Sequence, residues 1–144
     1  MKTILAPVDF SEVTGDVVSR AAALALALGA GVRLLHVVAP PVVMNEFGPP
    51  VADVPGEDGG DAAATLERWR GRLLEKGPLE VETALVFGPP VSTILEEARR
   101  SGADYIVMGS HGHAALYDLL VGSTTGGVLR RTPCPVVVLP SPGR

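Results

Sequence analysis

The chain has 144 residues, the length of one domain, and with 47% apolar and 19% charged residues it can bury a hydrophobic core. Its 12 basic and 16 acidic residues give a net charge of −4, which excludes a general nucleic-acid binder with a dense basic patch. A single cysteine, Cys134, excludes an internal disulfide and a cysteine-cluster metal site. Because the sequence has neither an apolar run of membrane-spanning length nor a secretory leader pattern, we expect one domain over residues 1–144, located in the cytoplasm.

Short apolar runs alternate with amphipathic stretches in the first half of the chain. The pattern predicts strands over Thr3–Val8 and Val32–Val38, and helices over Val13–Leu28 and Ala62–Lys76. Ser11 is a suitable N-cap for the first helix, and Gly29 is a suitable stop. The stretch Pro40–Gly60 is rich in proline, glycine and acidic residues without any period, so we expect a mobile loop there.

The second half repeats the alternation. Strands are predicted over Glu80–Phe87, Asp104–Met108 and Val136–Leu139, and helices over Pro90–Arg100 and Ser123–Arg131. Strands that are apolar on both faces and separated by helices indicate an α/β fold, a doubly wound three-layer sandwich with a five-stranded parallel sheet. Such sheets bind ligands beyond the carboxyl ends of their strands, where the strand order reverses.

The strongest candidate site is a pair of glycine-rich segments, Gly109-Ser110-His111-Gly112 and, after nine residues, Gly122-Ser123-Thr124-Thr125. The glycines allow a sharp turn and a close approach of the backbone to a ligand. The second segment opens a helix, where unpaired N–H groups and the helix dipole favour an anion. We expect a phosphate group there, and the alternative is an ordinary turn followed by an ordinary N-cap.

These segments resemble the nucleotide-binding signature of the universal stress protein family. The opening run Ile4–Glu12 is similar to the first strand and turn of that family, and Pro133–Val138 is similar to its last strand. The resemblance covers nearly the whole chain except the Pro40–Gly60 loop. It implies a Rossmann-like fold of the adenine nucleotide alpha hydrolase type and membership of the ATP-binding branch.

The resemblance also implies roles for individual residues. The phosphates would lie on Gly109, Gly112, Gly122, Ser123, Thr124 and Thr125, and we expect His111 to donate a hydrogen bond beside them. Asp9 would hydrogen-bond the ribose, and it also suits a bound cation, so magnesium is the expected companion ion. The backbone of His36–Val38, with Val37 and Val38 nearest, would border the adenine, and Pro7 and Met108 would pack beside it.

Other readings of these residues are less specific. Asp9 can also cap the turn around Ser11, and His111 with His113 is weak evidence for zinc. We expect His36 to be a packed, hydrogen-bonded residue, Cys134 to be a structural thiol, and the arginines at 68, 70 and 72 to be solvated. Trp69 is expected in the core of its helix.

The sequence is compatible with three functions. The first is an ATP-binding regulatory module of the stress response, and the alternatives are a slow ATP hydrolase and a stress protein that does not bind nucleotide. The segment between Pro7 and Glu12 has no glycine fingerprint for a dinucleotide, and a Gly-Lys-Ser/Thr motif is missing from the sequence. A phospho-acceptor receiver domain is excluded because Phe87-Gly88-Pro89 and Leu139-Pro140 stand where it needs an aspartate and a lysine.

The last strand suggests an assembly. Val136–Leu139 is a β-branched apolar run that falls at an edge of a five-stranded doubly wound sheet. An exposed apolar edge strand is a template for pairing with another chain, and the family resemblance also implies a homodimer joined through this strand. The alternative is a monomer in which a helix or the Pro40–Gly60 loop covers the edge.

Overall fold

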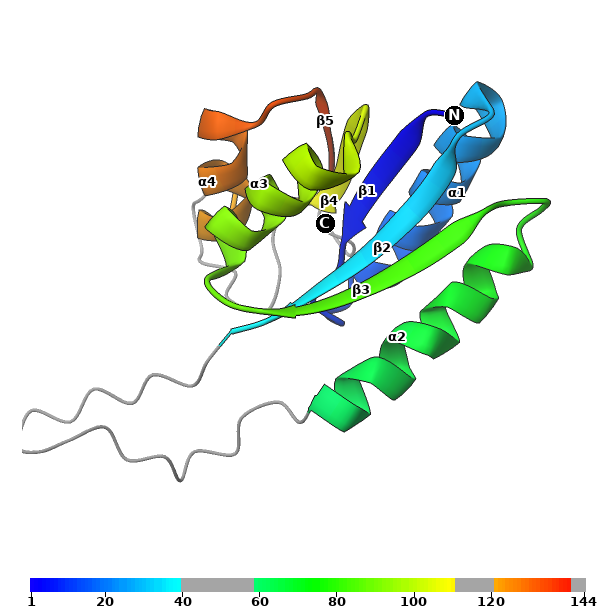
Figure 1. Ribbon diagram of the computed structural model, residues 1–144, viewed down its shortest axis with the longest axis horizontal. Helices are drawn as coiled ribbons and strands as arrows, with labels where there is room; N and C mark the ends of the chain where they lie inside the picture. Colours follow the sequence, from blue (N-terminus) through cyan, green and yellow to red (C-terminus); the bar gives the residue numbers. More distant parts are fainter. Residues whose placement is uncertain (40–58, 111–120, 141–144) are drawn as a thin grey trace, which may run out of the picture.

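In the computed structural model, which describes residues 1–39, 59–110 and 121–140, five parallel strands form one sheet between two pairs of helices (Figure 1). The strands are β1 (Thr3–Pro7), β2 (Gly31–Val38), β3 (Val81–Phe87), β4 (Tyr105–Gly109) and β5 (Val136–Leu139). The helices are α1 (Thr14–Leu28), α2 (Gly59–Leu74), α3 (Pro90–Ser101) and α4 (Ser123–Arg131). The strand order is β3-β2-β1-β4-β5, which confirms the doubly wound three-layer sandwich.

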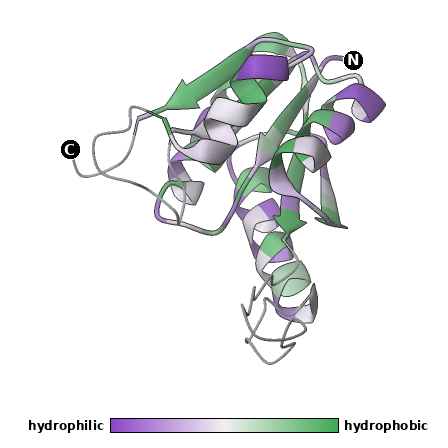
Figure 2. Cartoon of the chain, turned by 90° about the vertical axis from the view of Figure 1, so that its left-hand side faces the viewer, coloured by the Kyte–Doolittle hydropathy of each residue, from purple (hydrophilic) through white to green (hydrophobic). Residues whose placement is uncertain are grey.

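The helices cover the sheet in two pairs, with α1 and α2 on one face and α3 and α4 on the other. Side chains alternate along each strand, so neighbours enter opposite cores. In β1, Ile4 and Ala6 pack under α1 and α2, whereas Leu5 packs under α3 and α4. This is why the strands are apolar for most of their length, and Figure 2 shows green, hydrophobic stretches on the sheet. None of the helices within the described ranges is both long and apolar enough to cross a membrane.

The boundaries of the elements agree with the predicted ones to within three residues. The largest difference is α2, which begins at Gly59 instead of Ala62 and ends at Leu74 instead of Lys76. The last two residues of the stretch expected as a loop, 59 and 60, are therefore helical. The rest of that predicted loop, residues 40–58, lies outside the described residues, as do residues 111–120 of the connection after β4.

The predicted N-cap of α1 is wrong, and its predicted stop is confirmed. The N-cap position is Val13, without a side-chain cap, because the chain makes a turn at Ser11 before the helix begins. The Ser11 carbonyl accepts the Thr14 N–H at 3.0 Å, so Ser11 serves the turn through its backbone. At the other end, Gly29 has a φ of 66° and donates its N–H to the carbonyl of Ala25, as a left-handed C-cap does.

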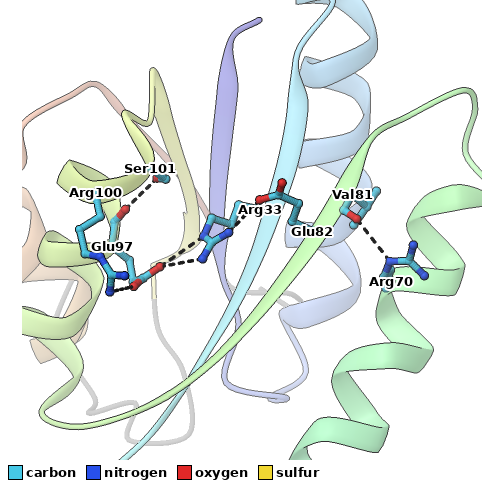
Figure 3. A network of polar contacts seen from close by, with 7 residues as sticks. All are labelled: Arg33, Arg70, Val81, Glu82, Glu97, Arg100 and Ser101. Carbon is cyan, nitrogen blue, oxygen red and sulfur yellow. Dashed lines mark hydrogen bonds and ion pairs between the residues drawn. The ribbon is translucent and has the colours of Figure 1, made fainter.

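A buried carboxylate joins α3 to the sheet at the end opposite the glycine-rich segments (Figure 3). Glu97 on α3 is only 3% exposed, and its Oε2 accepts from Nε and Nη2 of Arg33 on β2, both at 3.2 Å. The same guanidinium reaches Glu82 on β3 at 2.8 Å, and Arg100 reaches Glu97 Oε1 at 3.1 Å. A buried charge requires such partners, so this network ties one helix to two strands.

One of the three arginines of α2, Arg70, is less solvated than the sequence predicts. Arg70 is half-buried and donates from Nε to the Val81 carbonyl at 3.3 Å, which links α2 to β3 (Figure 3). Arg68 and Arg72 are exposed, as predicted, and the guanidinium of Arg72 lies 4.5 Å from the centre of the Trp69 ring. Trp69 packs against the core, as predicted.

Replacing Glu97 tests the buried network. Glu97→Ala leaves the guanidinium of Arg33 with one exposed partner, so we expect the free energy of unfolding to fall by about 2–4 kcal/mol. The matched control is Glu82→Ala, because the Glu82 side chain is 74% exposed and its loss should lower the free energy by less than about 1 kcal/mol. Urea unfolding measures both changes, and equal losses would contradict the role given to the buried carboxylate.

Candidate functional site

A cavity of about 420 Å³ lies at the carboxyl ends of the central strands. The ends of β1, β2 and β4 and the starts of α1, α3 and α4 all contribute to its walls. The chain leaves β1 toward β2 and β3 on one side of the sheet, and β4 and β5 lie on the other side. The cavity therefore occupies the point where the strand order reverses, which is where sheets of this kind bind ligands.

Most of the residues selected from the sequence lie in the wall of this one cavity. They are Pro7, Asp9, Val37, Met108, Gly109, Gly122, Ser123, Thr124 and Thr125. Val38 is not among the residues of the wall; its side chain is buried, and its carbonyl accepts the Gly88 N–H at 3.1 Å. His111 and Gly112, together with His113, lie outside the described residues.

The polar end of the cavity is the start of α4. Its N-cap, Gly122, is extended, and the first backbone bond of the helix runs from the Gly126 N–H to the Gly122 carbonyl at 2.8 Å. The N–H groups of the first turn, at residues 123–125, therefore precede the intrahelical bonds and carry the positive end of the helix dipole. Ser123 is exposed and has no carboxylate beside it within this helix turn. This geometry suits an anion.

Thr125 makes a structural contact that the sequence did not predict. Its hydroxyl is buried and donates to the carbonyl of Gly109 at 2.7 Å, so it fastens the end of β4 to the start of α4. The Gly122 N–H donates to the carbonyl of Ser110 at 2.6 Å and closes the same junction. The two glycine-rich segments are thus held together by two hydrogen bonds, and the hydroxyls left to meet a ligand are those of Ser123 and Thr124.

The other end of the cavity is apolar. Leu35, Ile94 and Met108 belong to the core between the sheet and the α3–α4 layer, and each also reaches the cavity wall. Pro7 and Pro90 add rigid apolar surface beside them. A flat, weakly polar ring is the kind of group that such a recess can enclose.

The turn after β1 contributes Asp9 to the wall of the same cavity. Asp9 is exposed, and its Oδ1 accepts the Ser11 N–H at 3.0 Å, so the capping role weighed from the sequence is present. Phe10 follows with a φ of 63°, a strained value for a residue with a side chain. Its ring stacks on His36 with centroids 4.0 Å apart. This turn fixes where the carboxylate of Asp9 can lie.

His36 is packed and hydrogen-bonded, as predicted. It is buried, and its Nδ1 lies 2.7 Å from the carbonyl oxygen of Val8. A carbonyl oxygen only accepts, so Nδ1 carries a proton in this contact. His36 also borders the cavity, and the hydrogen bond fixes the ring that supports Phe10.

The sequence reasoning missed the wall contributed by α1. Val13, Thr14 and Val17 line the cavity from that helix, and Thr14 is buried with a hydroxyl that has no hydrogen-bond partner in the part of the chain that the structure describes. The position of α1 in the chain could have indicated this contribution. The helix begins a few residues after Asp9, so its first turn must lie near the carboxyl ends of the strands.

The described residues include one cysteine and few candidate metal ligands that lie close together. Within residues 1–39, 59–110 and 121–140, no three His, Cys, Asp or Glu side chains gather as a metal site would require. Burial raises the pKa of the Cys134 thiol, a hydrogen bond from Thr132 offsets part of this, and the charge of Asp104 adds to the rise. A thiol that stays protonated is a poor nucleophile, in agreement with the structural role predicted for it.

Comparison with known proteins agrees with the geometry. The model of the universal stress protein family matches residues 1–140. A universal stress protein of Thermus aquaticus is 35% identical over 141 residues, 96% of this chain and 98% of that protein. The universal stress protein MJ0531 of Methanocaldococcus jannaschii is 29% identical over 145 residues, 98% of this chain and 83% of that protein.

Two solved structures share the fold. Protein MJ0577 of Methanocaldococcus jannaschii superposes with a TM-score of 0.79 at 26% identity, covering 99% of this chain and 98% of that one. A universal stress protein from Archaeoglobus fulgidus in complex with dAMP superposes with a TM-score of 0.72 at 25% identity, covering 96% of this chain and 97% of that one. With a family model that extends over nearly its whole length, the chain belongs to the universal stress protein family.

Proposed function

We propose that the protein binds an adenine nucleotide, ATP, in the cavity and acts as a regulatory module of the stress response in the cytoplasm. The observation that carries this proposal is that one cavity is lined by the start of α4, by an apolar group of side chains and by the carboxylate of Asp9. A nucleotide has three parts that suit these three kinds of lining, namely phosphates, a flat base and a sugar with two hydroxyls.

The relative from Archaeoglobus fulgidus supports the choice of ligand, because its structure contains dAMP, an adenine nucleotide. On this proposal the phosphates meet the backbone of Gly109 and Gly122 and the hydroxyls of Ser123 and Thr124, and Thr125 acts by holding the junction. His111 and Gly112 remain part of the proposed phosphate site.

The base would lie in the apolar recess, against Pro7, Val37 and Met108. Asp9 would accept hydrogen bonds from the ribose, and its carboxylate is exposed enough to share a magnesium ion with the phosphates. Among the described residues of the cavity wall it is the one carboxylate. With Asp9 committed to the sugar, the wall offers no second carboxylate to activate water, so binding and release fit better than rapid hydrolysis.

A substitution at Gly122 tests the phosphate site. Gly122 has a φ of −68° and a ψ of 168°, values that valine adopts easily, so Gly122→Val should fold normally. The branched side chain would stand in front of the first N–H groups of α4, and we expect ATP affinity to fall about 100-fold or more. Isothermal titration calorimetry measures the change.

The matched control for this test is Gly126→Val, four residues along the same helix, where an added Cβ meets nothing within 4 Å. Its ATP affinity should equal that of the wild type. Unchanged affinity in Gly122→Val would remove the phosphate site from the proposal. Failure of the wild type to bind ATP would favour the branch of the family that does not bind nucleotide.

A substitution at Asp9 tests the sugar contact separately. Asp9→Ala should weaken ATP about 10-fold, because a charged hydrogen bond to the ribose is lost, and should leave the affinity for inorganic triphosphate unchanged. Asp9→Asn is the control, since an amide oxygen can still accept the Ser11 N–H and preserve the turn. An equal loss for both ligands in Asp9→Ala would contradict the ribose assignment.

The proposed assembly is a homodimer through β5. This strand is at one edge of the sheet and pairs with β4 alone among the described strands. Val137 on it is 37% exposed, a large fraction for a residue in such an apolar run. Antiparallel pairing of two β5 strands across a two-fold axis would remove both edges from water.

Val137→Lys places a charge in the proposed seam, and we expect it to convert a dimer into a soluble monomer, measured by light scattering at micromolar concentration. The control is Phe87→Lys, which introduces the same charge on the opposite edge strand at a residue that is 65% exposed. It should remain dimeric. A wild-type protein that is already monomeric under these conditions would contradict the assembly.

A further inference from the structure

The backbone hydrogen bonds of β2 alternate between its two neighbouring strands. On the β1 side, the Leu35 carbonyl accepts the Val8 N–H at 2.8 Å. On the β3 side, the Val38 carbonyl accepts the Gly88 N–H at 3.1 Å. Residues two apart in a strand direct their backbone groups to the same neighbour, so the N–H of Val37 points to the β1 side, as the groups of Leu35 do.

The ladder between β1 and β2 stops one bond short of Val37. Its next bond would run from the Val37 N–H to the Val8 carbonyl, and the part of the chain that the structure describes does not make it. The Val8 carbonyl lies instead 2.7 Å from Nδ1 of His36, a buried side chain of β2 itself. A side chain thus takes the acceptor that the backbone of the same strand would use.

The Val37 N–H belongs to a wall where a polar group can orient a ligand. Val37 lines the cavity with Pro7 and Met108, in the apolar recess proposed for the base. A backbone N–H that the sheet does not use keeps its full capacity to donate. In a mostly apolar recess, such a donor fixes the orientation of a flat ring whose edge carries an acceptor, as the ring nitrogens of a purine do.

We infer that His36 is a positioning residue for the base, because its Nδ1–H occupies the Val8 carbonyl and so keeps the Val37 N–H available to the ligand. The inference rests on the proposed function, since it takes the ligand to be a nucleotide whose base lies in this recess. His36 acts here through Val8 and Val37, and the role requires no contact between the imidazole and the nucleotide.

Two substitutions separate the donor of His36 from its ring, which stacks on Phe10. His36→Phe keeps a planar ring and removes the donor, so the Val37 N–H can complete the ladder with Val8. We expect ATP affinity to fall about 5- to 10-fold by calorimetry, with no change for inorganic triphosphate, which has no base. His36→Asn loses the ring but keeps an amide N–H near the position of Nδ1, so it should retain most of the affinity.

Hydrogen exchange at single amides reports on the ladder directly. Without ligand, the Val37 amide of the wild type should exchange quickly, and ATP should protect it. In His36→Phe the same amide should be protected without ligand, because its bond to Val8 has formed. Leu35, which pairs with Pro7 in the ladder, is the internal control and should be protected throughout. A purely structural role of His36 would not increase the protection of Val37.

The matched control variant is Leu34→Val. Leu34 is a fully buried residue of β2 that does not border the cavity. The loss of one methylene lowers the stability of the core around β2. Both the ATP affinity and the exchange of the Val37 amide should nevertheless equal those of the wild type.

The outcomes distinguish the inference from the proposed function. If the wild type binds ATP and His36→Phe binds it equally well, the inference is overturned and the proposed function stands. Affinity that is kept in His36→Phe and lost in His36→Asn would also overturn it, since the ring and its stacking on Phe10 would then be what matters. So would a Val37 amide that is already protected in the wild type without ligand. If the wild type fails to bind ATP, the proposed function and this inference fail together.

Discussion

A parallel sheet needs both faces covered, and this requirement produces the cavity of the present fold. Each pair of parallel neighbours is joined by a helical crossover, and the crossovers must lie on both sides of the sheet. The strand β1 therefore lies in the middle of the sheet, with β2 and β3 on one side of it and β4 and β5 on the other. The connections leave β1 and β4 on opposite faces, and the space between them remains open.

The two ends of the sheet serve different purposes. At the amino ends of the strands, Arg33 and Glu97 meet in a charge network whose buried carboxylate has each oxygen paired. At the carboxyl ends, polar groups are gathered without complete pairing, as at Thr14 and in the first turn of α4. The network at the amino ends stabilises the packing of α3 on the sheet, and the first turn of α4 at the carboxyl ends has N–H groups that the proposed nucleotide would use.

The parts of the fold that follow from local chemistry could be predicted from the sequence. Period and length identify all the strands, and Gly29 ends α1 because only a residue without a side chain enters the left-handed region at little cost. The prediction that Ser11 caps α1 was wrong because the N-cap position depends on the shape of the turn before the helix. The residue types in that turn do not determine its shape. The sequence pattern also does not show where along β2 the cavity wall ends: Leu35, His36 and Val37 all line the cavity, and Val38 does not.

Contacts between distant segments could not be predicted in the same way. Arg33 and Glu97 are 64 positions apart, and nothing in the spacing of charges marks them as partners. Thr14 reads as an ordinary helical residue until the cavity is seen beside it. The glycine-rich segments predict a phosphate site because their chemistry is local, whereas the junction that Thr125 makes with Gly109 depends on how β4 and α4 meet.

The turn between β1 and α1 explains why such a site can be prepared before a ligand arrives. Phe10 adopts a positive φ that costs about 1 kcal/mol or more, and it keeps this conformation because its ring stacks on His36. His36 is in turn held by its hydrogen bond to the carbonyl of Val8, one strand away. The strain at Phe10 is thus balanced by buried contacts, so the carboxylate of Asp9 is positioned by the fold. A ligand that binds this carboxylate would meet a group that is already ordered, and little of its binding free energy would be spent on ordering it.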